Sequence, residues 1–165
     1  MKLIYAGTFD PPTLGHADLI QRAAKLAGSD GELAIVISRN IEKKTVFTEE
    51  ERLTMLLKLC AGYANIRVTA QSGMIAPFAE ERGYDALVRG LRNMQDFGYE
   101  STMAYYNHFL GQDLDTIFLI ARPEYREISS SGVRELIRFG VDFRGLLPEA
   151  IREYAWDIIQ HRRDE

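Results

Sequence analysis

The sequence predicts an α/β fold in which a doubly wound sheet of five parallel strands has helices on both faces. Short apolar runs alternate with longer segments whose apolar residues recur at helical spacing, and this alternation is typical of strand–helix–strand units joined by right-handed crossovers. Several runs are continuously apolar, as strands covered on both faces are. The 165 residues, 46% apolar and 27% charged, suffice for one domain with a sizeable core, which we expect to span residues 1–165.

The expected strands are the five short apolar runs, at residues 3–6, 33–37, 66–69, 86–88 and 116–120. The expected helices carry their apolar residues on one face. These residues are Leu19, Ile20, Ala23 and Ala27 in the first helix, Leu53, Leu56, Leu57 and Cys60 in the second, and Val133, Leu136 and Ile137 in a later one. The second helix begins at Thr48, and Glu51 completes a capping box with it.

Two further segments have helical spacing. A last helix over about residues 148–163 begins near Pro148, a residue favoured in first turns. Its inward-facing residues are Ile151, Tyr154, Ala155, Ile158 and Ile159. The residues Phe97, Met103, Tyr106 and Phe109 fit a helical packing face, in the core or at a subunit contact.

Composition excludes several classes of protein. The 20 basic and 24 acidic residues leave a net charge of −4, which argues against a dedicated nucleic-acid binder. Cys60 has no second cysteine to pair with, which favours a reducing compartment. No apolar run reaches the ~18 residues that span a bilayer, and the N-terminal residues do not resemble a secretory signal. We therefore expect a cytoplasmic protein without a membrane or nucleic-acid partner.

Unusual polar residues follow every predicted strand. These segments are Gly7–His16, Ser38–Arg39 with Lys43–Lys44, Ser72–Ile75, Arg89–Asn93, and Arg122 with Tyr125–Ser131. The carboxyl ends of parallel strands lie along one edge, where ligands bind in open α/β sheets. We therefore expect the five segments to meet at a single cleft.

The chemistry of these segments favours a polyanionic ligand. Gly7, Gly15 and Gly90 allow close approach of the backbone, and the serines 129–131 precede a helix whose N-terminus attracts anions. Lys43, Arg89 and Arg92 add cationic donors that suit phosphate. The sequence therefore predicts a strongly positive site for one or more phosphates.

The absence of several common motifs reduces the number of reaction types that the sequence favours. The sequence contains no G-x-G-x-x-G after its first strand, no P-loop and no G-x-S-x-G elbow. His16, His108 and His161 are too scattered for a local zinc site. Direct transfer between two bound substrates is then the simplest mechanism.

Each candidate residue alone also has a structural interpretation. A histidine at a helix start is often a hydrogen-bonded structural residue, and the serines 129–131 could serve only as a cap. Lys43 fits a solvated loop, and Arg89 and Arg92 could pair with Asp85 or Asp96. Their common position at the same end of each strand favours a binding site.

Two motifs resemble the signatures of the nucleotidyltransferase superfamily: residues 7–16, which end in Gly15–His16, and Ile128–Ser131. Three further stretches narrow the resemblance. They are Lys43–Lys44 before Phe47–Arg52, then Arg89–Arg92, then Asp96–Phe97 with Tyr99–Glu100. Together, over about residues 3–150, these stretches are similar to bacterial phosphopantetheine adenylyltransferase.

The resemblance implies a Rossmann-like fold of the nucleotidyltransferase type. It also implies an enzyme that moves AMP from ATP to 4′-phosphopantetheine with Mg²⁺, giving dephospho-coenzyme A and pyrophosphate. By motif match His16, Lys43 and Thr8 are catalytic, with His16 stabilising the transition state. The implied ATP positions are Thr8, Phe9, His16, Gly90, Leu91, Arg92, Glu100, Tyr125, Arg126, Glu127, Ile128, Ser129, Ser130 and Ser131. The implied acceptor positions are Thr8, Lys43, Ile75 and Arg89, and no residue is assigned to the metal.

The resemblance further implies a homohexamer and a site for which coenzyme A competes. The sequence departs from the family pattern at Ala6, Gly73, Arg126–Glu127 and His108, and none of these departures removes a phosphate-binding residue. Two other interpretations remain: a related adenylyl- or cytidylyltransferase with another phosphorylated acceptor, and a non-catalytic ATP-binding sensor.

Overall fold

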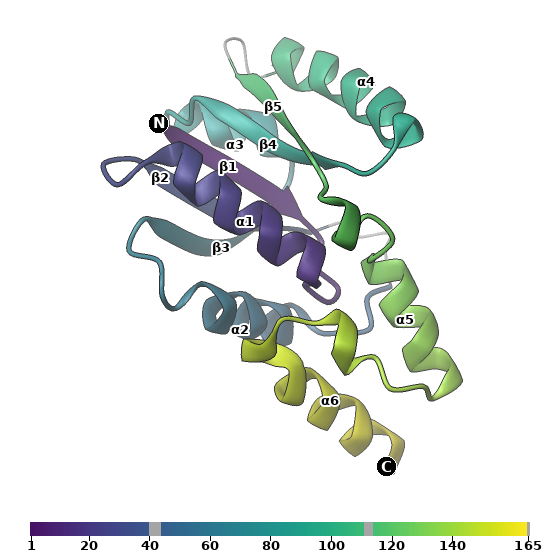
Figure 1. Cartoon of the computed structure of the whole chain (residues 1–165). Coiled ribbons are helices and arrows are strands. Elements are labelled where there is room, and N and C mark those ends of the chain that lie inside the picture. Colours follow the sequence, from purple (N-terminus) through teal and green to yellow (C-terminus); the bar gives the residue numbers. More distant parts are fainter. Residues whose placement is uncertain (40–43, 111–113, 165) are drawn as a thin grey trace.

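The structure is a computed structural model that describes residues 1–39, 44–110 and 114–164, and it confirms the expected α/β fold (Figure 1). One all-parallel sheet has the strand order β3-β2-β1-β4-β5. Its strands are β1 (Lys2–Gly7), β2 (Glu32–Arg39), β3 (Ile66–Ser72), β4 (Ala86–Leu91) and β5 (Asp115–Ile120). Within the described residues, no helix combines the length and apolar character that a membrane crossing needs.

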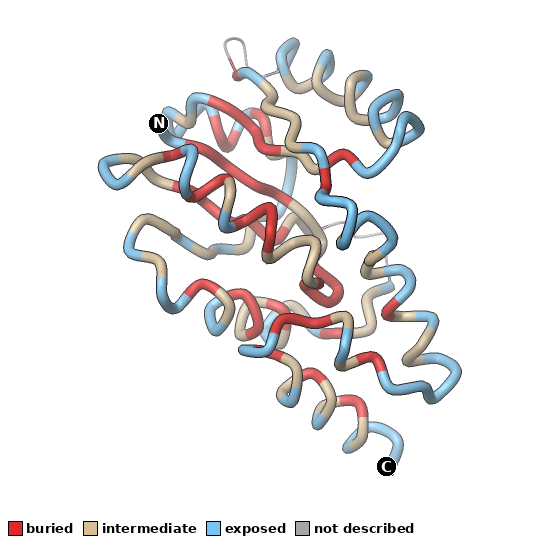
Figure 2. The backbone as a smooth tube through the Cα atoms, in the orientation of Figure 1, coloured by how far each residue is buried: buried red, intermediate tan, exposed pale blue. Residues whose placement is uncertain are grey.

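Helices connect the strands across both faces of the sheet. They are α1 (Leu14–Ala27), α2 (Glu49–Cys60), α3 (Ile75–Glu81), α4 (Met94–Leu110), α5 (Ser130–Phe139) and α6 (Glu149–Asp164), with the short 3₁₀ turns η1 (Pro123–Tyr125) and η2 (Arg144–Leu146). Leu3 and Tyr5 of β1 pack in one cluster with α1 and α2, whereas Ile4 and Ala6 pack in another with α3. Figure 2 shows β1 buried along most of its length, which explains its continuously apolar sequence.

A third cluster lies away from the sheet, between α2, α5 and α6. It contains Phe47, Met55, Val133, Phe143, Leu147, Ile151, Ala155 and Ile159. The capping box at the start of α2 is present: the Glu51 N–H donates to Thr48 Oγ1 at 3.2 Å, and the Thr48 N–H donates to Glu51 Oε2 at 2.7 Å. This capped start of α2 lies directly beside the third cluster, because Phe47 belongs to that cluster.

The apolar face of α2 differs from the one expected. Leu57 is 51% exposed, while Met55 is fully buried. Leu56 and Cys60 pack toward the sheet, and Met55 packs in the cluster with α6. Because α2 lies between the sheet and α6, its buried surface is turned away from Leu57.

Two helices depart further from the expectation. The seven-residue α3 was not predicted, since its first residues read as the loop after the third strand and so short an element shows little periodicity. In α4 no residue is buried, and Phe97, Tyr106 and Phe109 are 43%, 52% and 74% exposed. The placement of these aromatic residues in the core is therefore wrong, and a subunit contact stays a prediction.

The turn before β2 leaves no room for a side chain at Gly31. A Cβ there would lie 2.1 Å from the Ala27 carbonyl oxygen and 2.3 Å from that of Met1, both backbone atoms. We expect Gly31→Ala to lower the free energy of unfolding by about 2–3 kcal/mol, as measured by urea denaturation. The control is Gly62→Ala, where a Cβ would meet nothing within 4 Å, and where we expect a change within about 0.5 kcal/mol. Equal effects of the two substitutions would contradict this packing.

Candidate active site

The carboxyl edge of the sheet holds a cleft of about 340 Å³. It lies just beyond the residues that pair β1 with β4 (Leu3–Ile4 with Ala86–Leu87), between the turn after β1, the start of α1 and the start of α5. The residues that line it are Tyr5, Ala6, Gly7, Thr8, Phe9, Asp10, Thr13, Gly15, His16, Leu19, Arg89, Gly90, Arg92, Asp96, Glu100, Ala121, Tyr125, Ile128, Ser129, Ser130, Ser131 and Arg134. The expected meeting of polar segments is thus observed for three of them: those after β1, β4 and β5.

Two glycines lie in the walls of the cleft, and one of them, Gly90, allows a close approach of two elements. A Cβ at Gly90 would lie 2.4 Å from Leu19 Cδ1, so β4 can approach α1 this closely only with glycine there or with movement of Leu19. A Cβ at Gly15 would lie 3.6 Å from the Ile128 carbonyl oxygen, an ordinary van der Waals distance, so this position is close to Ile128 but has room for a Cβ. The first and second motifs therefore meet backbone to backbone at the start of α1.

His16 presents a neutral ring with a defined tautomer. The Thr13 N–H donates to His16 Nδ1 at 3.0 Å, and Thr13 Oγ1 lies 2.9 Å from the same nitrogen. Because a backbone N–H can only donate, Nδ1 is unprotonated and the ring proton sits on Nε2. Burial lowers the pKa of His16 to about 4, and the positive charge of Arg92 contributes to this shift. At neutral pH the ring therefore offers one hydrogen-bond donor, Nε2–H.

The N-terminus of α5 faces the cleft, but its hydroxyl groups have partners within the protein. Ser129 Oγ accepts from the Gly132 N–H at 3.1 Å, which caps the helix. Ser130 Oγ donates to the Pro11 carbonyl at 2.8 Å, and Ser131 Oγ accepts from Arg134 Nη2 at 2.9 Å. The first amides of a helix lack intrahelical acceptors, so the backbone of this turn is the better anion donor.

The two predicted arginines of the cleft pair with carboxylates. Arg89 donates from Nε and Nη2 to Glu100 at 2.6 and 2.7 Å, and from Nη1 to the Ala6 carbonyl at 2.9 Å. Arg92 donates from Nε and Nη2 to Asp96 at 2.9 and 3.2 Å. The hydrogen bond from Arg92 lowers the pKa of Asp96, so this carboxylate stays charged.

The charge of the lining differs from the strongly positive potential that the sequence indicated. Three arginines, Arg89, Arg92 and Arg134, face three carboxylates, Asp10, Asp96 and Glu100. A charge that is half-buried is stable only when it is paired, which explains why each cation of this lining has an acidic or carbonyl partner. The described lining therefore has no surplus of cations, and its neutral N–H donors, on His16 and in the first turn of α5, are free for an anion.

The structure brings together most of the predicted site residues. Those that line the cleft are Thr8, Phe9, His16, Arg89, Gly90, Arg92, Glu100, Tyr125, Ile128, Ser129, Ser130 and Ser131. The ring of Phe9 is 2% exposed and packs edge-on against His16 at 5.2 Å between ring centroids, so Phe9 offers a ligand its backbone.

Four predicted residues lie apart from the cleft lining, and one is not described. Leu91 is buried, Arg126 and Glu127 are exposed beyond η1, and Ile75 packs at the start of α3 against the core. Lys43 lies outside the described residues. Sequence reasoning missed Arg134, although its position three residues after Ser131 places both on one helical face.

The described residues contain no cluster of three or more side chains that could hold a metal ion by themselves. The carboxylates of the cleft are engaged with amides or arginines, as described above for Glu100 and Asp96. Magnesium in phosphoryl-transfer sites is commonly held by one or two protein oxygens together with substrate phosphates and water. An Mg²⁺ ion held mainly by substrate phosphates and water would need no preformed cluster among these residues.

Comparison with known proteins gives the family. Residues 4–136 match the family model described as cytidylyltransferase-like. A protein of Finegoldia magna named phosphopantetheine adenylyltransferase is 39% identical over 164 residues, covering 99% of this chain and 98% of that protein. The protein of the same name from Symbiobacterium thermophilum is 42% identical over 148 residues, 90% of each chain.

A solved structure shares the fold. It is described as a "putative nicotinate-nucleotide adenylyltransferase" of Vibrio parahaemolyticus, with a TM-score of 0.66 over 93% of this chain and 96% of that one. Its 17% sequence identity makes this a likeness of fold alone.

The environment of His16 predicts a pH dependence of stability. The folded-state pKa of about 4 lies below the ordinary value of 6.5. As the pH falls below 6.5, the unfolded chain binds a proton that the folded chain does not, so the stabilisation present above pH 6.5 is lost toward pH 4. Between pH 7.5 and 5 we expect the wild type to lose about 1–2 kcal/mol more than His16→Asn, measured by urea denaturation. Parallel pH profiles of the two proteins would contradict the assignment, and an NMR titration of the His16 ring provides the control.

Proposed function

Because the chain belongs to the cytidylyltransferase-like family and, within it, to the phosphopantetheine adenylyltransferases, we propose that its cleft is the site of their reaction. The chain is an adenylyltransferase of coenzyme A biosynthesis. It moves AMP from ATP to 4′-phosphopantetheine and releases pyrophosphate, leaving dephospho-coenzyme A.

One observation carries the assignment of this reaction to the cleft. The neutral His16 ring and the first turn of α5 line the same 340 Å³ space, just beyond the last pair of β1 and β4, Ile4 with Leu87. Both offer N–H donors that are oriented before a ligand arrives, one by the hydrogen bond from Thr13 and the other by the helix. Such donors stabilise negative charge as it develops on phosphate oxygens.

The transfer needs no covalent intermediate. An oxygen of the acceptor phosphate forms a bond to the α-phosphorus of ATP, while the bond from that phosphorus to the oxygen bridging to the β-phosphate breaks. Pyrophosphate leaves with the electron pair of the broken bond. The protein has to bring two anions into line and stabilise their charge.

We assign the parts of this reaction to three groups of residues. Thr8 and Lys43 orient the attacking phosphate, and His16 and Lys43 stabilise the oxygens on the α-phosphorus. Arg92, with Nε and Nη2 on Asp96, keeps Nη1 for the leaving pyrophosphate, together with the backbone at Ser130 and Ser131. His16 acts as a neutral donor, so its role does not depend on gaining a proton.

Fewer contacts among the described residues support the assignment of the 4′-phosphopantetheine side of the site. Arg89 has its three guanidinium nitrogens on Glu100 and the Ala6 carbonyl, so a phosphate has to replace the bond of Nη1 to Ala6. Ile75 begins α3, apart from the cleft lining, so its assignment to the pantetheine arm rests on the motif alone. The assignment of Lys43 to this side rests on the motif alone.

We further propose Mg²⁺ as the cofactor, carried by the phosphates of ATP. When bound, Mg²⁺ would neutralise charge on the phosphates of the nucleotide. Ser130 and Ser131 stand nearest to the leaving group in this assignment and would supply oxygen or water contacts to the ion.

Self-association is proposed from the surface of α4. Tyr99, Tyr105, Tyr106 and Phe109 are each more than half exposed, and such apolar surface on a soluble chain is typical of an interface. We propose that this face is buried in a homohexamer.

We also propose that coenzyme A competes for the cleft, because it contains the groups of the product. The enzyme works in the cytoplasm in this proposal, where the free Cys60 stays reduced.

The acceptor assay tests the function. With ATP and Mg²⁺, we expect pyrophosphate release to depend on 4′-phosphopantetheine and to be at least about 100-fold slower with nicotinate mononucleotide or a sugar phosphate. In the reverse direction, dephospho-coenzyme A and pyrophosphate should yield ATP. Release with another acceptor at equal rate would assign the chain to a related transferase, and no ATP formation in the reverse assay would favour a nucleotide sensor.

His16→Ala tests the assignment of the transition-state donor. Losing one preorganised donor costs about 10²–10³ in rate, so we expect kcat to fall by that factor while the KM for ATP changes by less than about fivefold. Steady-state kinetics of pyrophosphate release give both constants. An unchanged kcat would remove His16 from this role, and equilibrium binding of ATP to the variant controls for a loss of folding.

A further inference from the structure

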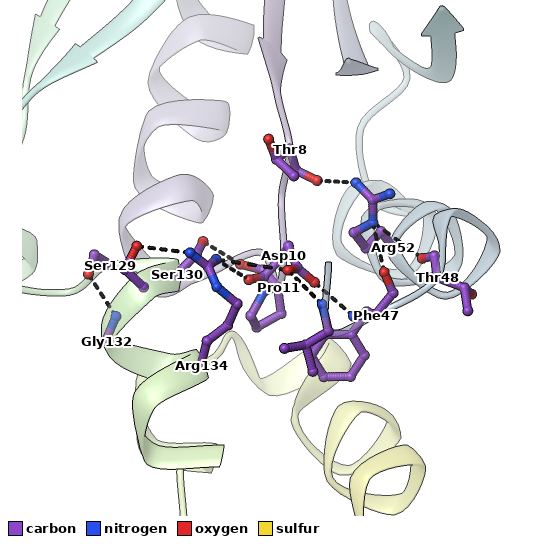
Figure 3. Close-up of polar contacts among 12 residues, drawn as sticks. Thr8, Asp10, Pro11, Phe47, Thr48, Arg52, Ser129, Ser130, Gly132 and Arg134 are labelled. Atoms are coloured by element: carbon purple, nitrogen blue, oxygen red, sulfur yellow. Dashed lines mark hydrogen bonds and ion pairs between the residues drawn. The ribbon is translucent and has the colours of Figure 1, made fainter. Parts of the chain in front are cut away.

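Two buried charged residues with no assigned role hold the turn that carries Thr8. Asp10 is 2% exposed and Arg52, from the first turn of α2, is 5% exposed. Figure 3 shows the pair with the residues they contact, between the turn after β1, the start of α2 and the start of α5. Burying a charge is costly unless it is fully hydrogen-bonded, so these contacts decide what the pair does.

Asp10 connects the turn to the segment that leads into α2. Its Oδ2 accepts from the Val46 N–H at 2.9 Å, and its Oδ1 accepts from the Phe47 N–H at 2.8 Å. Both oxygens of the carboxylate thus bind backbone amides of a segment more than thirty residues away in the chain. An apolar side chain at this position would leave both amides without their acceptor.

Arg52 connects the same two segments from the side of α2. Its Nη1 donates to the Thr8 carbonyl at 2.6 Å, and its Nε donates to the Phe47 and Thr48 carbonyls at 3.2 and 3.3 Å. Phe47 is therefore held at its N–H by Asp10 and at its carbonyl by Arg52. The Thr8 peptide is held by the same guanidinium.

Contacts from α5 hold the other side of the turn. Arg134 Nη1 donates to the Asp10 carbonyl at 2.8 Å, and Ser130 Oγ donates to the Pro11 carbonyl at 2.8 Å. The turn from Thr8 to Pro11 is thus fixed between α2 on one side and α5 on the other. Any displacement of Asp10 changes the position of Thr8 relative to the first turn of α5.

The turn also needs this support because of its backbone conformation. Phe9 has φ of +50°, in the left-handed region that non-glycine residues seldom adopt. Such a residue persists when its surroundings hold it, and these residues concentrate at binding sites. The hydrogen bonds to Thr8 and Asp10 act on the two neighbours of Phe9.

We propose that Asp10 and Arg52 are positioning residues for the adenylyl transfer: they hold the Thr8 turn against the start of α2 so that Thr8 meets the reacting phosphates in line. This inference rests on the proposed function. Neither residue acts on the substrates through its charge, since Asp10 is occupied by amides and Arg52 by carbonyls.

The first test compares Asp10→Asn and Arg52→Lys with a control at the same place. The asparagine amide can accept from only one of the two backbone N–H groups, and lysine lacks the fork that reaches three carbonyls. A displaced reacting group costs about 10–100-fold, so we expect kcat to fall by that factor in both variants, with the KM for ATP within about threefold. The control is Thr48→Ala, which removes the cap of α2 and leaves the carbonyl that Arg52 binds. We expect it to lower the melting temperature and to keep kcat within about twofold of wild type.

The second test asks whether Asp10 acts through Thr8. If it does, Thr8→Ala combined with Asp10→Asn is no slower than Thr8→Ala alone, because the group being positioned is already absent. Thr8→Ala combined with Thr48→Ala serves as the additive control.

Three outcomes would overturn the inference: kcat near wild type in Asp10→Asn and Arg52→Lys, a double variant whose losses multiply, or failure of both variants to fold, which would make the pair purely structural. A wild-type enzyme that releases no pyrophosphate with 4′-phosphopantetheine would instead overturn the proposed function.

Discussion

The winding of the sheet is the constraint on which the site depends. From β1 the chain winds through β2 and β3 on one side, then returns to place β4 and β5 on the other, so β1 and β4 become neighbours (Figure 1). At such a point the connections leave the two strands toward opposite faces, and a crevice opens at their carboxyl ends. Gly90 then lets α1 approach β4, because a Cβ there would lie 2.4 Å from Leu19 Cδ1. The cleft thus follows from the order of the strands, and Gly90 allows two of its walls to lie close together.

Electrostatics inside the cleft follow from its partial burial. Arg89 and Glu100 neutralise each other, as do Arg92 and Asp96, and Asp10 is satisfied by amides. His16 needs no charged partner because it stays neutral, since burial lowers its pKa to about 4. In the proposed reaction an arriving phosphate would thus meet N–H groups that are already oriented, and little of the site would have to reorganise around it.

The sequence predicted the fold well because its strongest signals are local. The buried strands are continuously apolar, and the capping box of Thr48 and Glu51 marks the start of α2. The interpretation went wrong where burial depends on distant partners: Leu57 turned out exposed and Met55 buried because α6 covers α2. The aromatic residues of α4 recur at helical spacing, yet they are exposed in the folded chain. Helical periodicity alone does not distinguish such an exposed apolar face from one that packs in the core.

The sequence predicted many of the residues that line the candidate site, but not the hydrogen bonds and ion pairs between them. The motifs placed His16, Arg92 and the serines 129–131 at one edge, as observed. The pairing of Arg89 with Glu100 joins β4 to α4. The contacts of Asp10 and Arg52 join the turn after β1 to the start of α2 and to α5. Because these partners are distant in the sequence, only the folded chain reveals the contacts. These pairings also explain why the charges of the lining balance, although the sequence of the loops indicated a strongly positive site.

A crystal structure with dephospho-coenzyme A tests the central claim most directly, because the product spans both halves of the site. We predict that its diphosphate lies within hydrogen-bond distance of His16 Nε2, with the adenine toward Tyr125 and Ile128 and the pantetheine arm leading away past Arg89. A diphosphate bound anywhere else on the molecule, or beside the cleft without contact to His16, would contradict it.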